Sequence, residues 1–554
     1  MLESPGTDEL YFLPLGGTGE IGMNLNLYGH AGQWLMIDLG ITFNDGKLPG
    51  VDVIMPDPSF IVERRDRLAG LVLTHGHEDH IGAVPYLWSR LRCPIYATAF
   101  TAALVRGKLE EAGLAGVVEM IELPLSGRHT IGPFELELVT LTHSIPEPNA
   151  VVLRTAAGTV LHTGDWKLDP EPQVGATYDE ARLRALADEG VLAMVCDSTN
   201  ALVYGQSGSE ASVKEALMDL VGELEQRVAV TCFASNVARL KTIGAVARAH
   251  KRQVALVGRS MKRIVEIAKE TGYLDDFPKI VSELEAASLP RRKVLLLLTG
   301  SQGERRSALW RIANDEHPDV RLDPGDAVIF SSRVIPGNEV SIFDLENELV
   351  RRQLRVISAE THPIHVSGHP ARDELAAMYQ WVRPEIAVPT HGEPRHLVEH
   401  ARLAAECQVP QQVVAANGAL VRLAPGRAAV VGEVPSGRLA LDGNRLRPVD
   451  SPVLRTRQKM IFSGAAVATL VLDRHGELCA SPQVTTHGLF DAASDADDLA
   501  TLAEEVEDAF ERLSDGQRRD DAKVKDAARS AVRRLCFRLL GKKPVTEVQL
   551  LRLP

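Results

Sequence analysis

The segment Thr74–His80, with the sequence THGHEDH, constrains this chain more than any other stretch. It places three imidazoles and two carboxylates directly after a short apolar run. Neutral imidazole nitrogens and carboxylate oxygens are ligands that suit zinc and its first-row neighbours. A strand followed by a tight glycine-containing loop lets His75 and His77 point one way while Asp79 and His80 point another. The segment therefore predicts ligands for two neighbouring metal ions, which together can activate water and stabilise both oxygens of an in-line displacement.

Further ligands stand at the ends of later apolar strands. His143, Asp165 and His391 each follow such a run, and Asp165 supplies the carboxylate that a pair of ions needs as a bridge. Strand-end side chains emerge at a rim, where binding residues are usually found. An isolated histidine is more often solvated or hydrogen-bonded than a ligand, so these three predictions depend on the dense cluster. We expect Asp38 and His162 to lie behind the ligands and to orient them.

A glycine-rich segment near the N-terminus resembles a dinucleotide-binding motif. Residues 17–22 read GTGEIG and fit G-x-G-x-x-G. The dinucleotide interpretation requires a helix immediately after the motif. Residues 24–28 instead alternate in polarity, which is typical of a strand. We therefore predict a turn at the rim of a cleft.

Composition limits the protein class. A chain of 554 residues exceeds what one hydrophobic core organises, so two to four domains are expected. No apolar run approaches the roughly 20 residues that span a bilayer, and the N-terminus has no apolar signal segment, so no membrane association is expected. The six cysteines are dispersed without a C-x-x-C pair, which favours free thiols in a reducing cytoplasm. A net charge of −13 argues weakly against a polyanionic partner, although bound cations reverse the local sign.

The pattern of apolar residues changes along the chain. Residues 11–60 predict hairpins, and residues 68–165 alternate short strands with helices. From about residue 210, long amphipathic helices alternate with buried-type strands at 228–230, 254–257, 294–298 and 327–330. This alternation predicts a parallel sheet. Residues 455–554 predict a separate small α+β unit, in which the apolar stripe of helix 521–540 packs either on its own strands or on a partner.

The metal motif resembles that of the metallo-β-lactamase superfamily. The long interval between Asp165 and His391, which contains the predicted parallel sheet, resembles the insertion of the β-CASP nucleases, whose added domain closes over the metal cleft and forms a channel for nucleic acid. Within that group the chain is most similar to the ribonuclease J family. The similar stretches are 17–22, 48–52, 163–167, 196–200, 234–237, 258–261, 299–304, 335–339, 365–369 and 543–548.

This resemblance implies an α/β fold: a metallo-β-lactamase αββα sandwich, an inserted β-CASP α/β domain and a small C-terminal α+β domain. The implied boundaries are 1–208 and 361–445 for the two parts of the sandwich, 209–360 for the β-CASP domain, 446–455 for a linker and 456–554 for the C-terminal domain.

The resemblance also implies roles for the candidate ligands. One zinc ion would be held by His75, His77 and His143, and the other by Asp79, His80 and His391, with Asp165 bridging. Mn²⁺ or Mg²⁺ could serve as activator. Asp79 and Asp165 would thereby also be catalytic, together with Asp197 and His369. Asp197 would be the acidic residue of β-CASP motif A, His369 the histidine of motif B and His391 the histidine of motif C.

Two further sites follow from the resemblance. A pocket for an RNA 5′-monophosphate would use Ser235, Asn236, His365, Val366, Ser367, Gly368 and His369. A structural calcium ion would use Asp52 and Asp442, where the alternative is an aspartate-stabilised turn. Two departures from the family pattern stand out. Trp166 and Leu168 replace residues that are usually Phe, and Arg305–Arg306 brings extra charge near the channel.

The expected activity is hydrolysis of single-stranded RNA, 5′-to-3′ from a 5′-monophosphate end and also internally, in RNA maturation, including that of rRNA, and mRNA decay. The resemblance implies a cytoplasmic homodimer or homotetramer that involves the C-terminal unit, and RNA-degradation complexes as partners. The alternatives are a small-molecule hydrolase of the same fold, a DNA-processing β-CASP nuclease and a non-catalytic RNA-binding scaffold. The first leaves the long insertion unexplained, and the last would require missing metal ligands.

Overall fold

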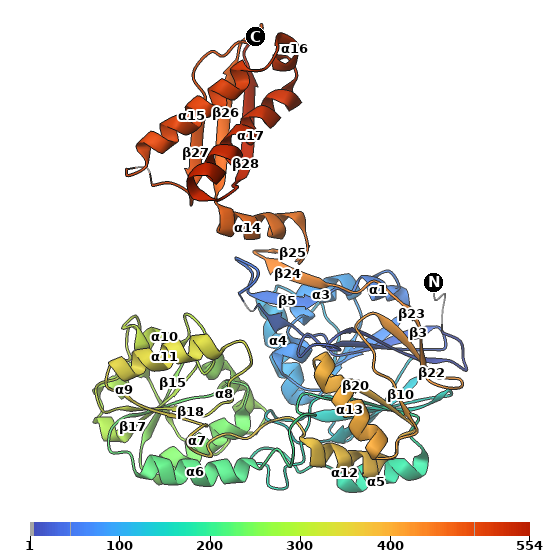
Figure 1. The fold of residues 1–554 in the computed structure, drawn as a ribbon. Helices are drawn as coiled ribbons and strands as arrows, with labels where there is room; N and C mark the ends of the chain where they lie inside the picture. Colours follow the sequence, from blue (N-terminus) through green and yellow to red (C-terminus); the bar gives the residue numbers. More distant parts are fainter. Residues whose placement is uncertain (1–4, 45, 492) are drawn as a thin grey trace. The chain divides into compact units, whose positions relative to one another are not determined.

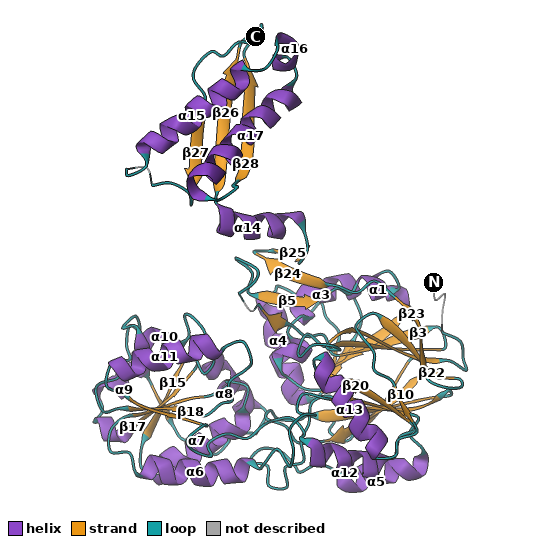
Figure 2. Ribbon diagram, viewed as in Figure 1, coloured by secondary structure: helices purple, strands orange, loops and turns teal. Residues whose placement is uncertain are grey.

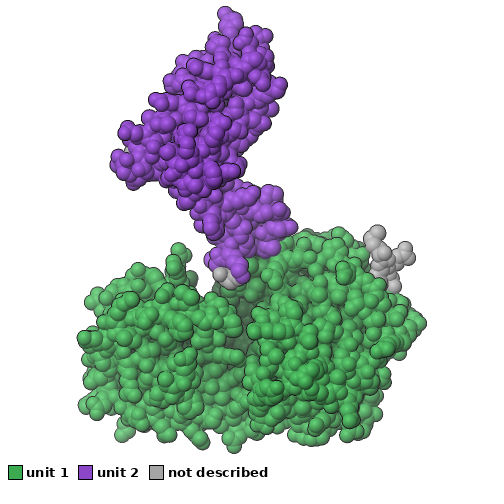
Figure 3. Space-filling model, in the orientation of Figure 1, with its two compact units in different colours: residues 1–45, 53–439 green, residues 46–52, 440–554 purple. Residues whose placement is uncertain are grey.

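The computed structural model describes residues 5–44, 46–491 and 493–554 (Figures 1 and 2). The chain divides into two compact units, residues 1–45 with 53–439 and residues 46–52 with 440–554 (Figure 3). Among the described residues, no helix has both the length and the apolar character that crossing a bilayer would need.

The first unit contains two sheets that pack face to face. In one sheet the strands follow the spatial order β23 (Ala429–Glu433), β22 (Ala419–Ala424), β1 (Leu10–Gly16), β2 (Leu25–His30), β3 (Gln33–Ile37), β6 (Leu68–Val72), β7 (Ile95–Ala97) and β8 (Met120–Glu122). The early strands are antiparallel hairpins, and pairing becomes parallel from β3 onward.

The second sheet of the sandwich carries most of the strand ends that bear polar residues. Its order is β21 (Gln411–Gln412), β20 (Ile386–Thr390), β13 (Ala193–Asp197), β12 (Gly158–His162), β11 (Asn149–Thr155), β10 (Phe134–Thr140) and β9 (Arg128–Ile131). Strands β12, β13 and β20 are mutually parallel, so their carboxyl ends meet at one edge. The residues just after these strands therefore lie close together although they are distant in sequence.

Apolar side chains from both sheets form the core between them. Phe12, Ile37, Leu138, Val195 and Val388 are among its fully buried members. A second core lies between the outer face of the second sheet and helices α5 (Glu180–Glu189), α12 (Arg372–Val382) and α13 (Pro394–Glu406). On the other side, α3 (Val84–Leu91) contacts α4 (Ala99–Glu111), which packs on β7 and β8. The layers are thus helix, sheet, sheet and helix.

The inserted domain is a six-stranded, wholly parallel sheet with helices around it (Figure 2). Its strand order is β16 (Ile280–Val281), β15 (Gln253–Val257), β17 (Val294–Leu298), β14 (Val228–Thr231), β18 (Ala327–Phe330) and β19 (Arg355–Ser358). Its helices are α6 (Glu210–Gly222), α7 (Val237–Ala249), α8 (Arg259–Glu270), α9 (Glu283–Ser288), α10 (Ala308–Ala313) and α11 (Glu339–Arg351). The continuous apolar sequence of β17, VLLLL, matches a strand that is covered on both faces.

Most of the second unit is a three-stranded sheet covered by two helices. Strand β26 (Ala465–Leu472) pairs antiparallel with β27 (Gln483–His487) and parallel with β28 (Val545–Arg552). Helices α15 (Ala496–Glu511) and α17 (Asp521–Leu540) supply the other half of its core. Val524, Ala528 and Val532 of the α17 stripe are buried in that core, so the stripe packs on its own strands.

The predicted architecture is present: an αββα sandwich, an inserted parallel α/β domain and a small C-terminal α+β domain. Strand β27 was not predicted, because its sequence QVTTH is too polar to stand out. The residues expected to form the linker 446–455 contain the end of β25 (Arg445–Pro448) and the start of α14 (Pro452–Ser463). The proposed domain boundaries stay a prediction.

Candidate metal centre

The loop that follows β6 brings the histidine cluster to the edge of the sandwich, where the short helix α2 (Glu78–Ile81) begins within it. Asp38 lies behind this loop, just after β3. One carboxylate oxygen, Oδ1, accepts from the Thr74 backbone N–H at 2.8 Å, and Oδ2 accepts from the Thr74 hydroxyl at 2.9 Å. The Nδ1 atom of His80 lies 2.7 Å from the same Oδ2. A carboxylate at Nδ1 fixes the ring with Nε2 free for the metal side.

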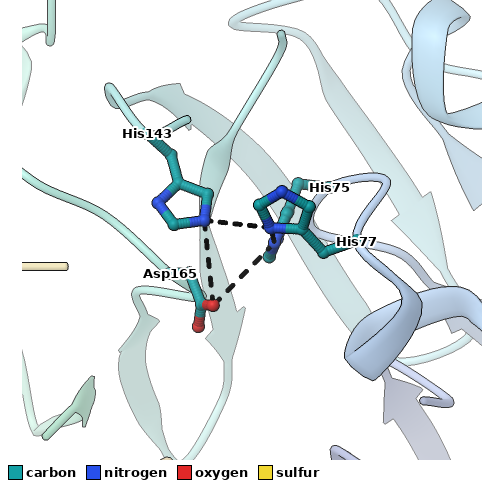
Figure 4. A group of neighbouring side chains, drawn as sticks. All are labelled: His75, His77, His143 and Asp165. Atoms are coloured by element: carbon teal, nitrogen blue, oxygen red, sulfur yellow. Dashed lines mark hydrogen bonds and ion pairs between the residues drawn. The ribbon is translucent and has the colours of Figure 1, made fainter. Parts of the chain in front are cut away.

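The first group of donors consists of His75, His77, His143 and Asp165 (Figure 4). Nδ1 of His77 lies 3.1 Å from Nε2 of His75 and 3.0 Å from Nε2 of His143. Oδ2 of Asp165 lies 3.9 Å from the Nε2 atoms of both His75 and His143. Three ring nitrogens and one carboxylate oxygen thus face a common point.

The second group consists of Asp79, His80, Asp165 and His391. Nε2 of His80 lies 3.2 Å from Oδ2 of Asp165 and 3.6 Å from Oδ2 of Asp79. His391 reaches Asp79 through Nε2 at 3.2 Å and Asp165 through Nδ1 at 3.1 Å. Asp165 therefore belongs to both groups and joins them.

The glycine-rich segment 17–22 forms a turn against the His391 loop. The backbone N–H of His391 donates to the Gly17 carbonyl at 2.7 Å, and the Thr18 and Thr390 hydroxyls lie 2.8 Å apart. His391 adopts φ = 51°, a left-handed conformation that non-glycine residues rarely hold without support from their surroundings. The segment that resembles a dinucleotide motif therefore positions a ligand.

The donor set fits two divalent cations. Zinc–nitrogen bonds of about 2.0 Å in a tetrahedral site place neighbouring donors about 3.3 Å apart, close to the 3.1 and 3.0 Å that separate the imidazole nitrogens of the first group. Asp165 is 3% exposed, and its Oδ1 atom has no hydrogen-bond partner. Its contact with the His391 ring, 3.1 Å from Oδ1, is an ion pair rather than a hydrogen bond, and a metal cation would lower the cost of burying this carboxylate further. Imidazole and carboxylate donors suit zinc, manganese or iron better than calcium.

Burial and mutual charge set the protonation of these groups. Burial lowers the pKa of His75 and His143, and it lowers that of His77 to about 4, so these imidazoles stay neutral and able to coordinate. Burial disfavours the charged forms of His80 and His391 as well, but the carboxylates around them, Asp165 foremost, together outweigh burial and raise their pKa. A bound cation would supply the positive charge that protons on these two rings otherwise supply.

Beside the donor groups lies the pair predicted from β-CASP motifs A and B. Asp197 ends strand β13 and is buried, and its Oδ2 lies 2.8 Å from Nδ1 of His369. The same nitrogen lies 3.8 Å from Oδ2 of Asp165. Burial favours the neutral ring, but the Asp197 and Asp165 carboxylates outweigh burial and raise the pKa of His369. The pair therefore favours a protonated ring beside a carboxylate, next to the metal groups.

The segment predicted to bind a 5′-phosphate, residues 365–369, also reaches the centre. The Gly368 carbonyl accepts from Nδ1 of His143, which fixes that ligand's ring. His365 is partly exposed, but its Nδ1 atom is buried and lacks a hydrogen-bond partner; burial, then the charges of Arg239 and Arg333, lower its pKa to about 3. Val366 packs beside Gly208, where an added Cβ would contact it.

Ser235 and Asn236 lie at the start of α7. The Asn236 side chain caps this helix by accepting from the Arg239 N–H at 2.8 Å. The Arg239 guanidinium, fully buried against Glu210, donates in turn to the Ile364 carbonyl at 3.1 Å. The start of α7 is thereby linked to the backbone just before His365.

Several residues of the site were not assigned roles from the sequence. Thr199 donates its hydroxyl to Oδ1 of Asp197 at 2.7 Å and lies 3.1 Å from Nδ1 of His391. Asn200 contacts Ser367 and His369. Their position just after Asp197 could have indicated a role in the site. The sequence around Arg239 gives no such indication, because its partners come from remote segments.

Asp442, one of the two residues expected to hold calcium, already contacts two arginines. Both Asp442 oxygens accept from Arg457, at 2.8 and 3.1 Å, and Oδ2 also accepts from Arg447 at 3.0 Å. A calcium ion at Asp442 would have to displace these two guanidinium groups. The calcium site at Asp52 and Asp442 stays a prediction from the family resemblance.

Four family models match the chain in succession. They are the metallo-β-lactamase superfamily over residues 22–188, the ribonuclease J β-CASP domain over 225–349, the Zn-dependent metallo-hydrolase RNA specificity domain over 355–411 and the ribonuclease J C-terminal domain over 452–553. Together they span both the sandwich and its insertion.

Similar proteins agree along nearly the whole length. The chain is 44% identical to ribonuclease J of Sinorhizobium meliloti, over 98% of this chain and 97% of that protein. It is 40% identical to ribonuclease J of Mycolicibacterium smegmatis, over 94% of this chain and 93% of that protein. It is also 40% identical to ribonuclease J of Corynebacterium glutamicum, over 88% of this chain and 69% of that protein. A crystal structure of an Enterococcus faecalis protein of unknown function matches with a TM-score of 0.52 at 14% identity, covering 75% of this chain and all of that one, which shows a shared fold alone.

Proposed function

The chain belongs to the ribonuclease J family of metal-dependent ribonucleases, and we propose that it removes nucleotides from the 5′-monophosphorylated end of single-stranded RNA and also cuts RNA internally. The observation that carries this proposal is the position of Asp165, which joins two four-donor groups beside the His369–Asp197 pair. Such an arrangement suits hydrolysis of a phosphodiester rather than binding alone.

The proposed ions are two zinc ions, with Mn²⁺ or Mg²⁺ as alternative activators. His75, His77 and His143 would hold one, Asp79, His80 and His391 the other, and Asp165 both. Bound there, such a pair lowers the pKa of water and offsets negative charge on a phosphoryl group. Asp38, through its contact with Nδ1 of His80, keeps that ring oriented toward the ions.

His369 is the proposed general acid. Its Nδ1 is engaged by Asp197, so Nε2 is the nitrogen that can reach a substrate. The neighbouring carboxylates favour its protonated form, and its side chain keeps 23% of its surface exposed. Protonation of the leaving 3′-oxygen by Nε2 would leave a 5′-phosphate on the product and a neutral ring, which Asp197 holds in place until it regains a proton.

The proposed 5′-phosphate pocket uses hydroxyl, amide and imidazole groups from Ser235, Asn236 and residues 365–369. Ser367 lies two residues before His369, so the proposed pocket adjoins the proposed general acid in the sequence. A pocket that accepts a terminal monophosphate one nucleotide from the ions would act as a ruler and favour stepwise removal of nucleotides. Internal cleavage would need RNA that enters without occupying the pocket.

A side-by-side digestion tests the proposal. Four substrates of one sequence are compared: 5′-monophosphorylated RNA, 5′-triphosphorylated RNA, circular RNA and 5′-monophosphorylated DNA. We expect nucleoside 5′-monophosphates from the first substrate, little from the second, internal cuts in the third and no release from DNA. Equal digestion of DNA would favour a DNA-processing nuclease, and hydrolysis of lactones or thioesters without RNA cleavage would favour a small-molecule hydrolase.

Assembly is a second part of the proposal. The family resemblance supports a homodimer or homotetramer that works with other RNA-degrading proteins in the cytoplasm. Light scattering of the full chain and of a chain that ends before α14 would test whether the C-terminal unit carries the contact. An unchanged oligomeric mass after truncation would contradict that part.

A further inference from the structure

The side-chain amide of Asn200 joins three segments at the edge of the metal centre. Asn200 is 3% exposed and stands three residues after Asp197. Its Nδ2 donates to the Ser367 hydroxyl oxygen at 2.8 Å and to the His369 carbonyl at 3.0 Å. Its Oδ1 accepts from Nη1 of Arg333 at 3.0 Å. Both donors and the acceptor of this amide are therefore engaged.

These contacts restrain His369 through its backbone. The His369 N–H donates to the Ser367 hydroxyl oxygen at 3.2 Å, the same oxygen that accepts from Asn200. The His369 carbonyl accepts from Asn200 directly, and Asp197 holds the ring at Nδ1. The amide thus acts on the backbone while the carboxylate acts on the ring, and together they fix where Nε2 points.

Arg333 extends the same hydrogen-bond chain into the inserted domain. It follows strand β18, and its carbonyl accepts from Nε2 of Gln302 at 2.8 Å. Oε1 of Gln302 accepts from the Ile335 N–H at 2.9 Å, so the loop that carries Arg333 is held on both sides. Asn200 is the point at which this loop meets the His369 loop.

We propose that Asn200 is a positioning residue for His369 and that Arg333 transmits the position of the inserted domain to it. This inference rests on the proposed function, in which His369 donates a proton. The amide carries no charge, so it acts by geometry. A displacement of about 1 Å at a reacting group can cost on the order of 10²-fold in rate. Loss of the amide should therefore reduce turnover without removing the metal ligands.

The test compares Asn200→Ala, Arg333→Gln and the double variant on 5′-monophosphorylated RNA. We expect Asn200→Ala to lower kcat about 10- to 100-fold with KM changed less than about threefold. Arg333→Gln should lower kcat by a smaller factor, and the double variant should be no slower than Asn200→Ala, because both act through one contact. Arg333→Lys, which keeps a charged donor on a longer side chain than Gln, should recover part of the loss.

Controls separate positioning from folding and from metal loss. Metal content should match the wild type in every variant, and every variant should be fully folded at the assay temperature, with only a small fall in thermal midpoint for Asn200→Ala because its buried partners lose a hydrogen bond. Asn314→Ala removes an exposed asparagine whose Nδ2 donates to the Trp310 carbonyl, and it should leave kcat unchanged. Unchanged kcat in Asn200→Ala, a loss that follows metal content or thermal midpoint, or additive effects in the double variant would overturn the inference. An inactive wild-type protein would instead overturn the proposed function and this inference with it.

Discussion

Nδ1 of His369 lies 2.8 Å from Oδ2 of Asp197 and 3.8 Å from Oδ2 of Asp165. One imidazole therefore contacts both the carboxylate that ends β13 and the carboxylate shared by the two donor groups. Because Asp165 and His369 come from opposite sides of the inserted domain in sequence, their meeting is a property of the fold. The predictions below follow from this arrangement.

Replacement of His369 by Gln should slow RNA cleavage about 10²- to 10⁴-fold, the usual contribution of a general acid. Metal content should be unchanged, because His369 is not one of the predicted ligands, although it stands with Asp165, Asp197 and His391 in a third group of neighbouring donors. Single-turnover cleavage together with metal analysis measures both quantities. His487→Gln, an exposed histidine in the C-terminal unit, is the matched control. Cleavage at the wild-type rate in His369→Gln would remove this residue from the mechanism.

Removal of metal by a chelator should abolish cleavage and lower the thermal midpoint. The buried carboxylate of Asp165 then loses the cations that offset its charge. A ligand present at 100 times its Kd stabilises the folded state by about 2.7 kcal/mol, so the shift should be measurable by calorimetry. Addition of Zn²⁺ or Mn²⁺ should restore both properties. Full activity after exhaustive chelation would contradict the assignment.

Substitution of Ser235 or Ser367 by Ala should affect removal of terminal nucleotides more than internal cleavage, although Ser367→Ala should also slow internal cleavage because its hydroxyl accepts from the His369 N–H. Both hydroxyls belong to the proposed phosphate pocket, which a circular RNA cannot occupy. The ratio of rates on linear 5′-monophosphorylated RNA and on circular RNA measures the effect. Ser126→Ala, an exposed serine whose hydroxyl lies 3.4 Å from that of Thr140, serves as control. Equal losses on both RNAs would argue against the ruler.

The sandwich should lose stability in acid, because the contribution of Glu137 depends on its charged form. Glu137 accepts from Arg182 at 2.6 Å and from Arg154 at 2.7 Å. Burial raises its pKa, but these arginines outweigh burial and hold the pKa below its usual 4.5. A carboxyl with a lowered folded pKa contributes stability above its unfolded pKa and loses it as pH falls through the folded pKa. The contribution is therefore complete near pH 7 and fades below about pH 4.5.

Denaturant unfolding of Glu137→Gln checks this expectation. At pH 7 the variant should be less stable by about 1–3 kcal/mol, the usual value of hydrogen bonds to charged groups. The difference from the wild type should shrink as pH falls below 4. Glu135→Gln, an exposed glutamate on the same strand, should change stability little. A difference that stays constant from pH 7 to pH 3 would show that the pair does not titrate as described.

The sequence predicted the fold and the candidate ligands because both depend on local patterns. His75, His77 and His80 stand out by density, and the strand ends at His143, Asp165 and His391 are visible as apolar runs. The supporting contacts are different. The Asn200 amide, the Gly368 carbonyl and the Arg239 guanidinium find partners in remote segments, and nothing in their own neighbourhoods marks those partners. Strand β27 was missed because few of its residues are apolar.

Release of nucleoside 5′-monophosphates from 5′-monophosphorylated RNA by wild-type protein and by Asp165→Asn tests the account most directly. Asp165 is the residue on which both donor groups depend, and the amide keeps its size while removing its charge. The account predicts steady release by the wild type and a loss of at least about 10³-fold in the variant, with the fold intact by circular dichroism. Release by Asp165→Asn at the wild-type rate would contradict it.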